Sequence, residues 1–245
     1  MEVLGVDIGG SGIKGAIVDT ASGEFASERL RIETPQPSKP AAVAAVVADI
    51  CAHFSWNGAV GCTVPAVVKR GVTMTAANID KAWIGTDVER LFESATGSPF
   101  IALNDADAAG IAEMRFGAGR DRDGLIAILT LGTGIGSSLF IDGRLVPNIE
   151  LGHLIIRGKD AEERATDRAR QTKGYSWKQW GKRVSEYLEY LESLITPDLF
   201  IIGGGVSKRH HKFFPYIQCK TVIAPAQLRN RAGIVGAAVA ALDRM

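Results

Sequence analysis

The chain has 245 residues, of which 46% are hydrophobic and 22% charged, and its formal net charge is +1. This composition is typical of a globular protein that folds as one large domain or two smaller ones. The small net charge provides no general attraction to nucleic acid or membrane, and no apolar run approaches the ~20 residues that span a bilayer. We therefore expect a cytoplasmic protein without a secretory signal, binding neither nucleic acid nor membrane.

The three cysteines, Cys51, Cys62 and Cys219, are an odd number and lack the Cys-x-x-Cys spacing. This pattern argues against both a disulfide framework and a structural zinc cluster. We expect reduced, buried thiols.

The first distinctive pattern is a pair of apolar runs, residues 3–8 and 13–19, separated by Gly9-Gly10-Ser11-Gly12. It predicts a β-hairpin whose glycine-rich turn lets backbone N–H groups approach an anion closely. A Walker loop is excluded, because Gly15 follows Lys14 and the next element is a strand. The same context excludes a dinucleotide-binding turn. Taken alone, the pattern is equally consistent with a simple turn.

The pattern recurs half a chain later. Residues 125–131 lead into Gly132-Thr133-Gly134-Ile135-Gly136-Ser137, and a second apolar run follows from residue 138 to 143. The repeat predicts two related domains that face each other across a cleft. It favours a shared anionic ligand over two unrelated turns.

The intervening residues predict a helix over 38–54, a buried strand over 59–66 and a helix from Thr86 to about Thr96, started by a capping box. Trp83, in the loop before this helix, is expected either to pack or to stack on a ligand. Residues 100–103 predict a buried strand followed at once by a helix. Asn104 and Asp105 then lie at the strand's carboxyl end, where ligands bind in open α/β sheets, although either residue could simply cap the helix.

Beyond the second hairpin, Glu150 and His153 flank a flexible Gly152 and can turn toward one small polar molecule. Gly152 disfavours a helical metal pair here. Residues 157–183 carry a net charge of +5 and residues 208–231 one of +6, which predicts either a local anionic partner or a solvated surface. A core helix through residues 184–195, a strand over 199–202 with a third glycine turn, and a helix over 232–242 complete the chain.

These groups suit phosphoryl transfer to a hydroxyl, which needs backbone donors around the phosphate, a magnesium ion and a carboxylate base. The two glycine turns supply the donors, Asp7 can hold a hydrated Mg²⁺, and Asp105 is the candidate base. Side chains that suit a polyol acceptor are Asn78, Asn104, Glu150 and His153.

Four motifs in this order resemble the ROK sugar kinases: Asp7-Ile8-Gly9-Gly10-Ser11-Gly12, Leu103-Asn104-Asp105-Ala106, Leu131-Gly132-Thr133-Gly134 and Glu150-Leu151-Gly152-His153. The resemblance implies an α/β, actin/hexokinase-like (ribonuclease H-like) fold with two domains, central mixed sheets and a cleft between the domains. We place a small domain over residues 1–104, with the final helix, 232–245, packed on it, and a large domain over 105–231.

Within this family, the absence of a zinc-binding cysteine cluster and the presence of Ser176-Trp177 with Trp180 resemble the polyphosphate glucokinases. Arg170, Gln171 and Gly181 stand where their motif has Lys, Glu and Ala. The resemblance implies a glucokinase that uses polyphosphate, with ATP as a second donor. The alternatives are a strictly ATP-dependent kinase for glucose, mannose or an N-acetylated sugar, and a non-catalytic sugar sensor. The sensor is less favoured because no helix-turn-helix segment precedes the first strand.

The resemblance also implies roles for single residues. Asp105 is the catalytic base, and Asp7 contacts Mg²⁺ through water. The glucose-binding residues are Asn78, Asn104, Asp105, Glu150, His153 and Glu162. The residues that bind the phosphate donor are Gly9, Gly10, Ser11, Gly12, Lys14, Thr133, Gly134, Gly204 and Lys208. The family is commonly homodimeric, so a homodimer is expected.

Overall fold

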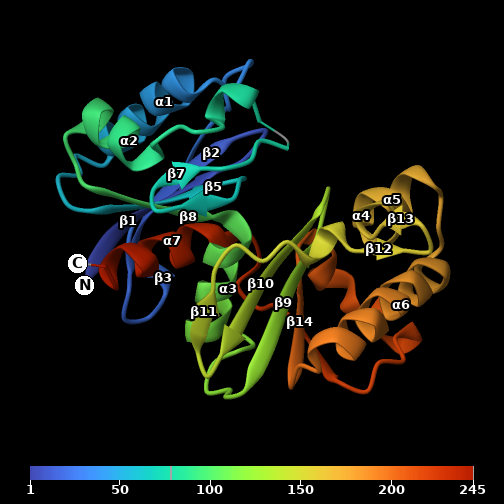
Figure 1. Cartoon of the computed structure of the whole chain (residues 1–245). Coiled ribbons are helices and arrows are strands. Elements are labelled where there is room, and N and C mark those ends of the chain that lie inside the picture. The colour runs from blue at the N-terminus through green and yellow to red at the C-terminus, as the bar shows by residue number, and fades with distance from the viewer. Residues whose placement is uncertain (78, 245) are drawn as a thin grey trace. The chain divides into compact units, whose positions relative to one another are not determined.

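The computed structural model describes residues 1–77 and 79–244, which form two compact units (Figure 1). The first unit comprises residues 1–112 and 231–245, and the second comprises residues 113–230. The division falls inside helix α3 (Asp105–Phe116), and the domain boundary expected after residue 104 stays a prediction. Asn78, an expected sugar-binding residue, lies outside the described residues.

The first unit is built on a mixed sheet with strand order β3-β2-β1-β5-β8, to which β4 adds by pairing with β2. β1 and β2 form an antiparallel hairpin closed by the pair Ile8 and Ile13, whereas β1, β5 and β8 run parallel. This confirms the predicted first hairpin and the buried strand before Asn104. The strands are β1 (Glu2–Ile8), β2 (Ile13–Asp19), β3 (Glu24–Phe25), β4 (Leu30–Ile32), β5 (Val60–Val64) and β8 (Phe100–Asn104), with a separate pair, β6 (Val68–Lys69) and β7 (Val72–Thr73).

Two helices, α1 (Pro40–His53) and α2 (Val88–Thr96), cover one face of this sheet, and α7 (Ala232–Leu242) covers the other (Figure 1). Trp83, in the short 3-10 turn η1 (Lys81–Trp83), is 1% exposed, and its indole N–H donates to the Ser38 carbonyl at 2.7 Å. Trp83 is therefore part of the core. The predicted cap of α2, Thr86, was one residue early, because the Thr86 hydroxyl donates to the Ala82 carbonyl and Asp87 caps the helix.

Helix α7 packs against the sheet at glycine positions. A methyl group on Gly61 would lie 1.8 Å from the Ala237 carbonyl oxygen, far inside van der Waals contact. A methyl group on Gly5 of β1 would likewise lie 2.1 Å from the Ile234 carbonyl oxygen. Close approach of backbones explains why this helix is so rich in alanine and glycine.

The second unit repeats the same core topology in a sheet with strand order β11-β10-β9-β14-β15. β9 and β10 form an antiparallel hairpin, and β9, β14 and β15 run parallel, just as β1, β5 and β8 do in the first sheet. The repeated hairpin predicted from the sequence is thus confirmed. The strands are β9 (Leu125–Leu131), β10 (Ile135–Ile141), β11 (Arg144–Val146), β14 (Leu199–Gly203) and β15 (Val222–Pro225).

Helix α6 (Trp177–Ile195) packs on this sheet through the predicted stripe, with Val184, Tyr187, Leu188 and Leu191 all buried. Between the hairpin and α6 lies a run of short elements: η2 (Leu151–His153), β12 (Ile155–Ile156), β13 (Lys159–Asp160), α4 (Glu162–Ala165) and α5 (Asp167–Thr172). After β14 follow η3 (Gly205–Lys212) and η4 (Phe214–Tyr216), with η5 (Arg229–Arg231) before α7.

The three cysteines are free thiols; Cys51 and Cys62 are buried, as expected, whereas Cys219 is half-buried. Burial raises the pKa of Cys51 and Cys219 to about 11, so both stay protonated near neutral pH. Within the described ranges, none of the helices has the length and hydrophobicity needed to traverse a bilayer.

Candidate functional site

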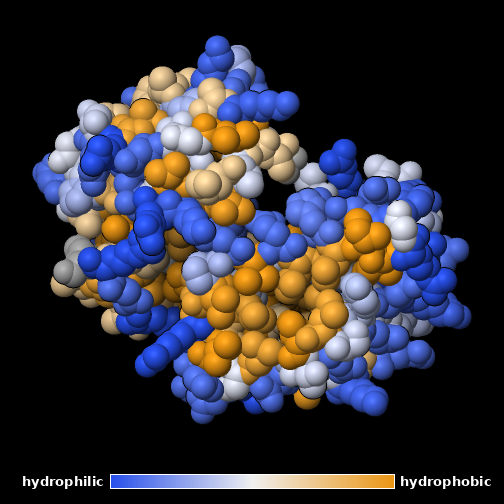
Figure 2. Space-filling model, in the orientation of Figure 1, coloured by the Kyte–Doolittle hydropathy of each residue, from blue (hydrophilic) through white to orange (hydrophobic). Residues whose placement is uncertain are grey.

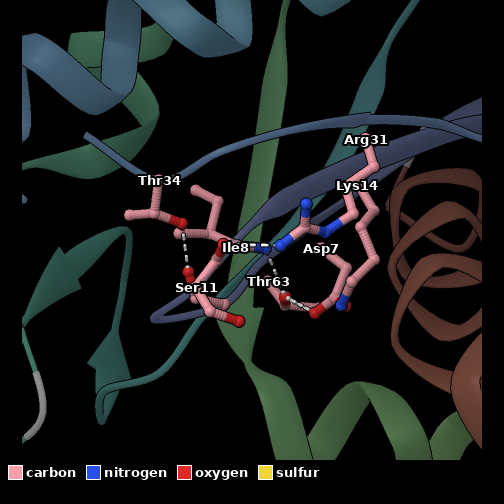
Figure 3. Close-up of polar contacts among 8 residues, drawn as sticks. Asp7, Ile8, Ser11, Lys14, Arg31, Thr34 and Thr63 are labelled. Atoms are coloured by element: carbon pink, nitrogen blue, oxygen red, sulfur yellow. Dashed lines mark hydrogen bonds and ion pairs between the residues drawn. The ribbon is translucent and has the colours of Figure 1, made fainter.

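The glycine turn of the first unit is held from outside by side chains that bind its carbonyl groups. The Thr34 hydroxyl donates to Gly9 O at 2.5 Å, and the Arg31 guanidinium donates to Ser11 O at 2.8 Å (Figure 3). Among the described residues, the N–H groups of Gly10, Ser11 and Gly12 have no protein acceptor. A turn with fixed carbonyls and several N–H groups that bind no other protein atom is suited to an anion.

Below this turn, three polar side chains from three strands form one network (Figure 3). Asp7, on β1, accepts from the Lys14 ammonium at 2.9 Å through Oδ2 and from the Thr63 hydroxyl at 3.0 Å through Oδ1. Thr63, fully buried on β5, in turn accepts from the Ile8 N–H at 3.2 Å. The ion pair neutralises the Asp7 carboxylate and fixes the lysine beside the turn.

Asn104 and Asp105 lie at the carboxyl end of β8, as predicted, but their environments differ. Asn104 is 9% exposed; its Oδ1 accepts from the Ala106 and Asp107 N–H groups, and its Nδ2 donates to the Ala66 carbonyl. Asn104 therefore caps α3 and fixes the start of the helix. Asp105, the first residue of α3, is exposed. The strand thus presents an exposed carboxylate on a firmly capped helix start.

The glycine turn of the second unit is held by a carboxylate. Glu162, at the start of α4, accepts from the Ile135 N–H at 2.7 Å. A methyl group on Gly134 would lie 2.6 Å from the same Glu162 oxygen, so a side chain there would displace the carboxylate. The N–H groups of Thr133 and Gly134 have no protein acceptor among the described residues. This turn also offers backbone donors to an anion.

Next to this turn, His153 is fixed by Asp160, a residue on β13. His153 Nδ1 lies 2.9 Å from Asp160 Oδ2, and Asp160 Oδ1 accepts from the Glu162 N–H at 2.8 Å. The Asp160 hydrogen bond, with nearby Glu162 and Glu150, raises the pKa of His153 despite partial desolvation. Glu150 lies just before η2, and desolvation of its carboxyl group, with the charge of Glu162, raises its pKa against the opposing effect of His153.

His153, Asp160 and Glu162 each bring one potential metal-binding atom within 4.8 Å of the others. Hydrogen bonds already involve these atoms: His153 with Asp160, and Glu162 with the Ile135 N–H. The geometry is that of a chain of hydrogen bonds that holds the imidazole and the glycine turn in place. The free imidazole Nε2 is then the atom that a polar ligand would meet.

The remaining predicted donor residues lie after β14. Gly204 has φ 81°, a conformation that favours glycine, and Lys208 is exposed on η3. The Ser176 motif begins α6: Ser176 and Gln179 form a capping box, and Trp180 is fully buried. A methyl group on Gly181 would lie 2.9 Å from the Phe213 carbonyl oxygen, so α6 approaches this backbone closely.

Four residues that hold these groups were not predicted from the sequence: Thr63, Arg31, Thr34 and Asp160. Thr63 was detectable as a polar residue in a buried apolar run, and Asp160 as a carboxylate two residues before a helix start. No local pattern singles out Arg31 or Thr34, because they reach the turn only through the pairing of β4 with β2.

Two sheets of matching topology, each with a glycine-turn hairpin, define the actin/hexokinase-like fold of sugar kinases. Residues 3–166 match the ROK family, and the chain belongs to it.

Several of its relatives are kinases that act on sugars. It is 47% identical over 240 residues to the polyphosphate glucokinase of Mycobacterium tuberculosis (strain CDC 1551 / Oshkosh), covering 98% of this chain and 91% of the relative. The crystal structure of inorganic polyphosphate/ATP-glucomannokinase from Arthrobacter sp. strain KM matches with a TM-score of 0.92 at 47% identity, covering 100% and 99% of the two chains. A ROK family glucokinase from Streptomyces griseus, in complex with glucose and AMPPNP, matches with a TM-score of 0.80 at 26% identity, covering 99% and 100%.

Proposed function

We propose that this protein is a glucokinase that transfers a phosphoryl group from inorganic polyphosphate, and from ATP as a second donor, to the 6-hydroxyl of glucose. The observation that carries the proposal is the 47% identity, over nearly the whole chain, with a polyphosphate glucokinase. The two glycine turns with N–H groups left to an anion support the same chemistry.

In the proposed reaction, Asp105 accepts the proton of the 6-hydroxyl while that oxygen attacks the terminal phosphorus of the donor. The bond between this phosphorus and the bridging oxygen breaks, and the shortened phosphate chain leaves with the electron pair. A general base contributes roughly 10²–10⁴-fold. Positioning and electrostatic stabilisation account for more of the acceleration in phosphoryl transfer. The exposure of Asp105 on a capped helix start supports its role.

The proposal assigns glucose to the side chains of Asn104, Asp105, Glu150, His153 and Glu162, and to Asn78. It assigns the donor phosphates to the turn at residues 9–12, Lys14, Thr133, Gly134, Gly204 and Lys208. The Lys14 ion pair with Asp7 supports this assignment, because it fixes an ammonium group beside the first turn. The hydrogen bond between His153 and Asp160 leaves Nε2 of the imidazole for a sugar hydroxyl.

Magnesium is part of the proposal. Asp7 fits a metal-bound water better than the bare ion, because Lys14 already neutralises its carboxylate and both oxygens keep lone pairs that accept further hydrogen bonds. When bound, Mg²⁺ would offset the charge of the donor phosphates.

We further propose a cytoplasmic homodimer.

The test measures glucose 6-phosphate formed by the purified protein with long-chain polyphosphate, with ATP and with neither donor. We expect turnover with both donors, and kcat for Asp105→Ala to fall by at least about 10²-fold. The circular dichroism spectrum of this variant should match that of the wild type. The control, Asp123→Ala, removes another exposed aspartate and should match the wild type.

Normal turnover by Asp105→Ala would disprove the role of the base. A wild-type enzyme that is indifferent to polyphosphate would instead be an ATP-dependent ROK kinase, the second candidate, which the match to the AMPPNP-bound Streptomyces griseus glucokinase supports. Assays with mannose and with N-acetylated sugars as acceptors then define the sugar specificity of the kinase.

A further inference from the structure

The second unit has a pocket of about 570 Å³, and none of the candidate site residues lines it. Four cationic side chains line it: Arg157 from the turn between β12 and β13, Arg164 from α4, and Lys182 and Arg183 from α6. All four belong to the basic segment 157–183. In Figure 2, mostly hydrophilic residues cover the part of this unit where α4, α5 and α6 lie in Figure 1.

Two of these cations are oriented by one carboxylate. The guanidinium groups of Arg157 and Arg164 both form ion pairs with Glu186 on α6. Burial alone would raise the pKa of Glu186. The two arginines outweigh this effect and hold the pKa below its usual value, so the carboxylate stays charged. Each guanidinium has five N–H donors in a rigid plane and uses only part of them on Glu186. The remaining donors are oriented before a ligand arrives, which lowers the entropic cost of binding.

The other side of the pocket is also positively charged. Lys182 is exposed, and the Arg183 guanidinium is held by a hydrogen bond to the Gln179 carbonyl at 3.0 Å and by the ring of Tyr175, 3.9 Å away. Glu189, the second acidic residue of the lining, accepts from the Ser185 hydroxyl. Four cations against two carboxylates leave a net charge of +2. Such a surface favours a ligand that carries several negative charges.

A short segment connects this pocket to the proposed catalytic groups. Asp160 and Glu162, which hold His153 and the second glycine turn, lie between Arg157 and Arg164 in the chain. Within α4, Glu162 and Arg164 are two residues apart and so point to opposite sides of the helix, because each residue turns the helix by about 100°. One side of α4 thus supports the turn, and the other lines the pocket.

We propose that this pocket binds phosphate units of a long inorganic polyphosphate chain that lie beyond the unit being transferred. An extended chain with a negative charge on every phosphate meets several cations at once, whereas ATP and tripolyphosphate carry only two phosphates beyond the transferred group. The pocket therefore increases affinity for long donors without taking part in the transfer. This inference rests on the proposed function.

The test compares KM for long-chain polyphosphate, tripolyphosphate and ATP in Lys182→Glu and in Arg157→Ala/Lys182→Glu. Both positions are exposed, so folding should be preserved. For long-chain polyphosphate we expect KM to rise about tenfold or more in the double variant, with kcat unchanged. KM for glucose, ATP and tripolyphosphate should stay within about twofold. Added salt should weaken long-chain binding in the wild type more than in the variant, since it screens exposed charges.

The matched control is Arg144→Glu, which reverses an exposed charge of the same unit on β11, outside the pocket. An equal rise in KM for all donors, or no rise for the long chain, would overturn the proposal. If the wild type uses no polyphosphate at all, the proposed function fails by itself. Binding of fluorescently labelled long-chain polyphosphate to the wild type and the double variant, without glucose, then decides whether the pocket binds the chain.

Discussion

The contact between Gly134 and Glu162 allows a sharp test of how the second glycine turn is built. In Gly134→Ala, the new methyl group would lie 2.6 Å from Glu162 Oε1 and 3.2 Å from the carboxyl carbon. The carboxylate must therefore move, and its 2.7 Å hydrogen bond with the Ile135 N–H is lost. A hydrogen bond to a charged group contributes about 1.5–3 kcal/mol. Because Glu162 is only half-buried, water replaces part of this, and we expect the free energy of unfolding to fall by about 1–2 kcal/mol.

The catalytic efficiency should fall as well, because the displaced carboxylate is also a proposed glucose ligand. We expect kcat/KM for glucose to decrease at least about tenfold, which corresponds to about 1.4 kcal/mol. Steady-state kinetics at saturating donor measures this, and urea unfolding measures the stability. Gly132→Ala is the control in the same turn, since a methyl group there has open space.

A double-mutant cycle with Glu162→Ala identifies the cause. If the methyl group acts by displacing Glu162, Gly134→Ala should have no further effect once the carboxylate is gone. Additive losses would refute this reasoning and point to the backbone of the turn instead.

Two further predictions concern packing and protonation. Gly61→Ala places a methyl group against the backbone of α7 and should lower the free energy of unfolding by about 3 kcal/mol in urea titrations, whereas Gly10→Ala, with open space around it, should change it by less than about 0.5 kcal/mol; equal effects would contradict the packing argument. Asp160→Asn should lower the pKa of His153, measured by NMR titration, because the hydrogen bond to Asp160 is the main cause of its rise. Since a raised histidine pKa stabilises the fold below the unfolded value of about 6.5 and this contribution disappears as pH rises through the folded pKa, the stability difference between wild type and Asp160→Asn should be larger at low pH than above the folded pKa. A difference that is independent of pH would exclude this coupling.

Much of the secondary structure was predictable because its signals are local. The apolar runs around each glycine turn predicted both hairpins, and the Ala-rich pattern predicted α7 over residues 232–242. The start of α2 was not predictable to the residue, since Thr86 and Asp87 are both good caps. The Thr86 hydroxyl instead donates a hydrogen bond to the Ala82 carbonyl, a contact that depends on the preceding turn.

The candidate site was predictable only in part. The residue types around Asp7, Asp105, Glu150 and His153 indicated the chemistry, and their roles stay proposals. The distinction between Asn104 as a buried cap and Asp105 as an exposed carboxylate required the structure, because either side chain is chemically able to cap a helix.

The sequence by itself therefore determined the repeated hairpins, the strand that ends at Asn104, and the family to which the chain belongs. Each of these features depends on patterns of residues that are contiguous in the chain. Only the tertiary structure decided how the turns are held: Thr34 and Arg31 reach the first turn, and Glu162 reaches the second. It also decided that four cations from separate elements line one pocket. The physical reason is that these contacts join residues distant in sequence, whose approach depends on sheet pairing and helix packing rather than on local propensity.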